Sequence, residues 1–169
     1  SIHHATHGNL HKRGMGDINV FTLQEYRALP FHKRLAYQLY RHPLVMFGLG
    51  PSFVFFLLYR YPSGLMRAGW IYWASAMGTN LAIAAIAAAM MWLVGWQAFL
   101  FVHVPIVVIG ATIGIWLFYV QHQFEETNWQ HEPEWDLHDA ALAGSSHYVL
   151  PPVLRWFTGN IGFHHIHHL

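Results

Sequence analysis

Histidines form two clusters near the ends of this chain. His3 and His4 lie close to its beginning, and His164, His167 and His168 lie close to its end. The last three stand at positions i, i+3 and i+4, so on a helix their imidazoles project from one face. Neutral imidazoles on one face suit iron, copper, zinc or nickel. The spacing therefore predicts a metal site, whose metal the residues alone leave undecided.

A third contribution to this site is expected from His122, which follows the last of three apolar stretches and should emerge at the membrane surface. The six candidate ligands are too many for one tetrahedral zinc and suggest two metal ions. The chain has no cysteine, which excludes thiolate ligands and disulfides. The first cluster would match the spacing of the second if a histidine preceded Ser1, so we expect the chain to be a fragment cut inside its own motif.

Carboxylates are expected behind the ligands, because a ligating histidine usually donates its other ring N–H to a carboxylate or carbonyl. The polar segment after His122 offers Glu125, Glu126, Asp136 and Asp139. Seven further histidines lie in polar loops and are expected to be solvated: His7, His11, His32, His42, His131, His138 and His147. His103 lies inside an apolar stretch, where a functional role and a simple hydrogen bond to a neighbouring helix are equally good interpretations.

The elements that position these histidines are expected to be membrane helices. Hydrophobic residues make up 54% of the 169 residues and charged residues only 10%, against roughly 25% charged in soluble domains. The formal charge of +1, without a long basic run, excludes a nucleic-acid surface. We predict one all-α integral membrane domain over residues 1–169, with polar segments at 1–42 and 121–169 and membrane segments at 43–120.

Three apolar stretches lie in the middle segment. Residues 70–96 and 98–120 are long enough to cross a bilayer of ~30 Å, and they predict a transmembrane helical hairpin. Residues 43–59 are shorter and contain Gly48, Gly50 and Pro51. A metal site shared by both histidine clusters requires an even number of crossings between them, so we expect residues 43–59 to be re-entrant or interfacial.

The basic residues predict the orientation. All nine Lys and Arg side chains lie outside the hairpin 70–120. By the positive-inside rule both histidine clusters then face the cytoplasm. Residues 1–42 and 121–169 should form a helical cap that carries the histidines, with helix formers from Thr22 to Arg41 interrupted at Pro30.

Four stretches together resemble membrane fatty acid desaturases, most closely the bacterial acyl-lipid Δ12 (omega-6) type. They are residues 3–10 (HHATHGNL), 13–18 (RGMGDI), 121–125 (QHQFE) and 156–169 (WFTGNIGFHHIHHL). The resemblance maps the second family histidine box onto His3 and His4, the third onto His164, His167 and His168, and an isolated ligand onto His122. The first box, the leading histidine of the second and the first pair of spans are missing, so this chain alone is expected to be inactive.

The resemblance implies a multi-pass enzyme of the bacterial inner membrane. It would use two iron ions, O₂ and electrons from a ferredoxin or a b-type cytochrome to desaturate a fatty acyl chain. A di-iron hydroxylase or ketolase of alkanes or carotenoids is the nearest alternative. A metal transporter or haem electron carrier fits less well, because a transporter places its ligands within the spans and a haem needs only two histidines.

Overall fold

The computed structural model describes residues 2–13, 16–61 and 69–169. Within these ranges every regular element is a helix, and the only extended pairings are two isolated bridges. This confirms the predicted all-α class. The chain divides into two compact units, one made of Ser1–Arg34 with Trp116–Leu169 and the other of Leu35–Ile115.

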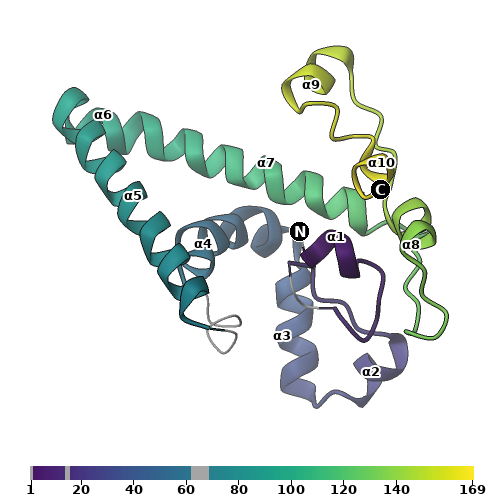
Figure 1. Ribbon diagram of the computed structural model, residues 1–169. Helices are drawn as coiled ribbons and strands as arrows, with labels where there is room; N and C mark the ends of the chain where they lie inside the picture. The colour runs from purple at the N-terminus through teal and green to yellow at the C-terminus, as the bar shows by residue number, and fades with distance from the viewer. Residues whose placement is uncertain (1, 14–15, 62–68) are drawn as a thin grey trace. The chain divides into compact units, whose positions relative to one another are not determined.

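The unit Leu35–Ile115 contains most of the predicted hairpin, whose last turns from Trp116 belong to the other unit (Figure 1). Helix α5 (Trp70–Val94) ends at Gly95, and α6 (Trp96–Ala98) and the π-helix Phe99–His103 lead into α7 (Val104–His122). Gly95 has φ +86°, a conformation that side-chain-bearing residues rarely adopt, and this allows the tight turn. Trp70–Val94 and Trp96–His122 are both long and apolar enough to cross a membrane. At 1.5 Å per residue, α5 is about 38 Å long, more than the ~30 Å it needs.

The segment before the hairpin is broken. Helix α3 (Phe31–Arg41) and the run Val45–Arg60 are bent by 61° relative to each other, with Pro43 between them. That run comprises the π-helix Val45–Leu49, α4 (Gly50–Phe56) and the 3₁₀ turn Leu58–Arg60. The break fits a re-entrant or interfacial segment, which stays a prediction. Residues 62–68, between this run and α5, lie outside the described residues.

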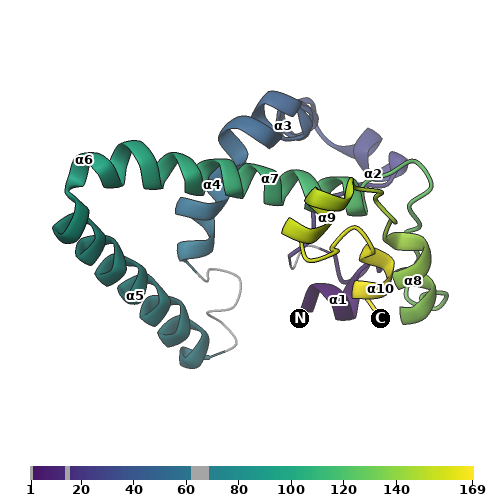
Figure 2. The ribbon, with the colours of Figure 1, turned by 90° about the horizontal axis from the view of Figure 1, so that it is seen from above.

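The other unit is built from short helices gathered at the end of α7 (Figure 2). Helix α2 (Leu23–Ala28) begins at a capping box in which Thr22 and Glu25 satisfy each other's backbone N–H groups. Pro30 separates α2 from α3, as predicted. Helices α1 (Ile2–Thr6) and α10 (His164–His167) both contact α8 (Leu137–Gly144). The side chain of Asp136 caps the N-terminus of α8, and Ala140 and Ala141 of this helix are buried.

A loop between α8 and α10 carries α9 (Pro152–Phe157). The loop is closed at its base by a hydrogen bond of 2.8 Å from the backbone N–H of Tyr148 to the carbonyl of Gly162. A Cβ at Gly162 would lie 2.3 Å from the Tyr148 carbonyl oxygen, so only glycine permits this approach.

We therefore expect Gly162→Ala to lower the melting temperature of the detergent-solubilised chain, with a loss of about 1–3 kcal/mol from overpacking. The control is Gly114→Ala on α7, where a Cβ meets no atom within 4 Å. Circular dichroism during heating measures both variants. Equal melting temperatures for the two would contradict the close pairing at the base of the loop.

Candidate metal centre

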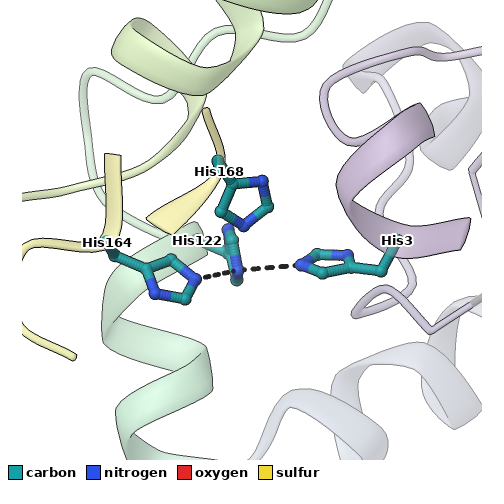
Figure 3. A group of neighbouring side chains, drawn as sticks. All are labelled: His3, His122, His164 and His168. Atoms are coloured by element: carbon teal, nitrogen blue, oxygen red, sulfur yellow. Dashed lines mark hydrogen bonds between the residues drawn. The ribbon is translucent and has the colours of Figure 1, made fainter. Parts of the chain in front are cut away.

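Four histidines from three helices converge in the structure (Figure 3). His122 lies between the other rings: its Nε2 is 3.1 Å from Nε2 of His3 and 2.8 Å from Nε2 of His164. The ring of His168 lies 5.0 Å from that of His122 and 4.8 Å from that of His164, centroid to centroid. One nitrogen from each of the four rings lies within 4.8 Å of the others.

Local structure explains the convergence. His122 is the last residue of α7, where its backbone carbonyl accepts hydrogen bonds from the side chains of Gln123 and Thr127. His164 begins α10 and His168 follows its end, so the i and i+4 positions place the two rings on one side of the chain. His3 lies on α1, which packs against α8. The site therefore depends on α1, α7 and α10 being held together within one unit.

Burial keeps these imidazoles neutral. His122, His164 and His168 are each no more than 5% exposed. Burial, followed by the charge that His167 would carry, lowers the pKa of His164 to about 4, and burial followed by the charge of His7 lowers the pKa of His168 to about 2. At neutral pH both rings are uncharged and each has one nitrogen lone pair available to a metal.

The arrangement of the ring nitrogens indicates a cation-binding site. Nε2 of His122 faces two other ring nitrogens, but a neutral imidazole cannot donate a proton to both. Among the described residues, Nε2 of His168, a nitrogen of the fourth ring, is buried without a hydrogen-bond partner. A buried nitrogen without a hydrogen-bond partner lowers the stability of the folded protein. A bound metal ion would remove this cost, because it accepts the nitrogen lone pair. The residues therefore fit a metal ion.

The other two predicted ligands lie beside this group without joining it. The ring of His4 is 4.6 Å from the rings of both His167 and His168, centroid to centroid. The ring of His167 is 5.2 Å from that of His164, and its side chain is exposed. The structure thus brings all six predicted histidines into one continuous cluster, of which His3, His122, His164 and His168 form the tight group.

A carboxylate supports the cluster, but it is none of those expected. Oδ1 of Asp17 accepts a hydrogen bond of 2.6 Å from Nδ1 of His3, and the Asp17 side chain is only 2% exposed. Burial alone would raise the pKa of Asp17, but the hydrogen bond from His3 and the nearby imidazole of His7 outweigh it and lower that pKa. The expected carboxylates make no described hydrogen bond to a cluster histidine; Asp136 instead caps α8. Asp17 lies in the turn after the first histidine cluster and not in the polar segment that follows His122.

His7 corrects a second expectation. We expected it to be solvated, yet it is 2% exposed. Its Nε2 donates a hydrogen bond of 2.6 Å to the carbonyl of Gly144, and its ring lies 4.4 Å from that of His122. With His3 and Asp17 it forms a second group of possible metal ligands. The signal in the sequence was its i+4 spacing from His3, which places the two on one side of α1.

The remaining histidines follow the sequence prediction. Six of the seven that were expected in solvent are exposed: His11, His32, His42, His131, His138 and His147. His103 is half-buried and stacks on Phe99, with ring centroids 5.0 Å apart. Gly14 and Met15 lie outside the described residues. Asn9 is fully buried, and its Oδ1 accepts the backbone N–H groups of His11 and Lys12.

Comparison with known proteins adds to this geometry. The family model described as "Fatty acid desaturase" matches residues 1–169. A relative from Bacillus subtilis (strain 168), described as "Fatty acid desaturase", is 50% identical over 170 residues. The match covers 100% of this chain and 47% of the relative, so the chain spans about half of the relative's length. No solved structure matches.

Proposed function

The chain belongs to the fatty acid desaturase family, and from this membership we propose that it serves an oxygen-dependent enzyme that introduces a cis double bond into a fatty acyl chain. We assign the substrate as a membrane lipid and the position as Δ12 (omega-6), following the resemblance of the histidine-containing stretches. The convergence of His3, His122, His164 and His168 carries the proposal, because such a set suits a metal that handles O₂.

We propose two iron ions as the metal. The predicted ligands are His3, His4, His122, His164, His167 and His168, and the second group around His7 and Asp17 lies against them. Bound iron would supply the activation of O₂ needed to convert CH₂–CH₂, O₂, two electrons and two protons into CH=CH and two water molecules. Neutral imidazoles bind such ions without adding negative charge.

The residues of the chain have three tasks in this scheme. Asp17 holds Nδ1 of His3 and so turns its Nε2 toward His122. Burial of His122, His164 and His168 keeps water away from the reacting atoms. Phe118 lies one turn before His122 on α7, with its ring 4.6 Å from that of His122, and offers an apolar surface on which an acyl chain can approach the site.

The site also supports the proposed topology. His3 and His122 belong to one tight group, so the chain between them must cross the membrane an even number of times. Helices α5 and α6–α7 provide two crossings if the bent run Val45–Arg60 does not span. With the basic residues outside the hairpin, we propose that the cluster faces the cytoplasm of a bacterial inner membrane.

An acidic ferredoxin or a small b-type cytochrome is the proposed electron donor. Of the two basic pairs in the sequence, Lys12 and Arg13 are already engaged in ion pairs with Glu132 and Glu25. Lys33 and Arg34 on α3 are therefore the better basic pair for such a donor.

The test is a fatty acid profile by mass spectrometry. The chain is expressed in two forms in a bacterial host without polyunsaturated lipids. One form is the chain alone, and the other is the chain joined to the part of the B. subtilis relative that lies outside the match. We expect a new Δ12 diene from the joined protein, lost in His164→Ala and retained in His138→Ala, an exposed histidine. As a control, the part of the B. subtilis relative that lies outside the match, expressed without this chain, must give no diene.

Other products decide against the proposal. An alcohol or ketone in place of the diene would assign the hydroxylase or ketolase reaction instead. An iron-loaded protein that yields no oxidised product with several acyl chains and donors would overturn the oxidoreductase assignment. A diene that persists in His164→Ala would separate the activity from the histidine cluster.

A further inference from the structure

The loop that carries α9 leaves an apolar surface uncovered. An antiparallel bridge between His147 and Phe163 and the hydrogen bond from Tyr148 to Gly162 close the base of this loop. At its tip, Trp156 is 76% and Phe157 73% exposed. A contiguous apolar surface of this kind marks an interaction site. We call it the α9 patch, and its members are Val149, Val153, Leu154, Trp156 and Phe157.

Contacts along α7 fix the direction of the loop. The backbone N–H of Ser146 donates to the carbonyl of Gln121 at 3.0 Å, and its hydroxyl donates to the carbonyl of Val120 at 3.2 Å. Two residues later, the ring of Tyr148 lies 5.5 Å from that of Trp116. The loop therefore runs antiparallel to α7, away from the metal cluster and back along the helix.

The returning side of the loop is held in the same place. Nε2 of Gln121 donates a hydrogen bond of 2.8 Å to the carbonyl of Ile161. Within this unit, Figures 1 and 2 both show α9 farther from the C-terminal end of α7 than α8 and α10 are. The base of the loop thus lies at the polar end of α7, and its tip lies on the side of the apolar turns that begin at Val120 and Trp116.

We propose that the α9 patch inserts into the interfacial layer of the phospholipid bilayer, in the leaflet where α7 ends. Trp156 and Phe157 would continue the lipid-facing surface of α7, because tryptophan and other aromatic side chains favour the membrane interface. Residues 148–163 carry one charge, that of Arg155. Its guanidinium lies 5.7 Å from the ring of Phe163 at the base of the loop, so the charge is turned toward the aqueous side, as a snorkelling arginine requires.

Such an anchor would have a consequence for the metal cluster. The loop ends at Phe163, and His164 follows directly. Insertion of the α9 patch would fix the depth of His164 and His168 relative to the bilayer surface, where an acyl chain must arrive. The proposal rests on α7 spanning the membrane and does not depend on the desaturase activity.

Single-cysteine labelling tests the proposal, because the chain has no cysteine of its own. Phe157→Cys is compared with Leu142→Cys, an exposed position on α8, and with Ile109→Cys, an exposed position within α7. Each variant carries an environment-sensitive fluorophore in vesicles of phosphatidylethanolamine and phosphatidylglycerol. We expect position 157 to be quenched by spin-labelled lipid and protected from iodide, as position 109 is, with the reverse at position 142.

Three other results overturn the proposal. Quenching of position 157 by iodide, as at position 142, would place the α9 patch in water. Protection from both quenchers together with energy transfer between labelled copies would assign the patch to a second copy of the chain. Iodide quenching at position 109 would show that α7 does not span the bilayer. None of these results concerns the fatty acid profile, so failure here is distinct from failure of the proposed activity.

Discussion

Replacing His122 by alanine is expected to abolish tight metal binding by the purified chain. His122 is the central residue of the four, with Nε2 within 3.1 Å of ring nitrogens of both His3 and His164. Without it the remaining imidazoles lose the ligand that lies between them, and a site with an incomplete ligand set holds its metal weakly. Iron content by elemental analysis and the melting temperature with and without Fe²⁺ measure the effect.

Two comparisons make this result interpretable. His42→Ala removes an exposed histidine and should leave metal binding unchanged. His164→Ala removes a neighbouring histidine of the same group and should also weaken metal binding. If His122→Ala fails to fold, His164→Ala still tests whether the histidine group binds the metal. Metal ions stabilise a protein only when they bind its folded state. A His122→Ala variant that retains its iron and its metal-dependent rise in melting temperature would refute the central role of this residue.

Replacing Asp17 by asparagine is expected to weaken metal binding by about 10–100-fold, the usual cost of losing the carboxylate behind a ligating histidine. Asp17 receives Nδ1–H of His3 at 2.6 Å and lies 3.9 Å from Nδ1 of His7. An amide keeps the shape of the carboxylate but loses the charge that fixes the His3 proton on Nδ1. Titration of the metal-free chain with Fe²⁺ or Co²⁺ measures the affinity.

The matched control is Asp139→Asn, which makes the same chemical change at an exposed carboxylate that the sequence had suggested. We expect it to bind metal as the unchanged chain does. Equal weakening in both variants would show a general effect of charge, and no weakening in Asp17→Asn would remove Asp17 from the metal site. The visible spectrum of the Co²⁺ form gives a readout that depends on ligand geometry rather than on activity.

The sequence alone determined the membrane elements, because these depend on local composition. The predicted runs 70–96 and 98–120 are apolar over a length that only a membrane helix needs, and the structure forms α5 and α6–α7 there, over 70–94 and 96–122. Pro30 and Gly95 end helices for reasons that belong to single residues: a missing N–H group in one case and a positive φ in the other. The i, i+4 spacing of His164 and His168 likewise placed both at one site.

Tertiary structure alone decided which groups support the histidines. Asp17 lies 105 residues from His122 in the sequence (122 − 17), and both contact His3 only because α1 packs at the end of α7. The i+4 spacing of His7 from His3 is a local signal, but its burial is decided by packing, because its Nε2 reaches the carbonyl of Gly144 on α8. Residue type and spacing thus determined the metal chemistry, whereas long-range packing, which no local pattern encodes, decided the charge and orientation of each ligand.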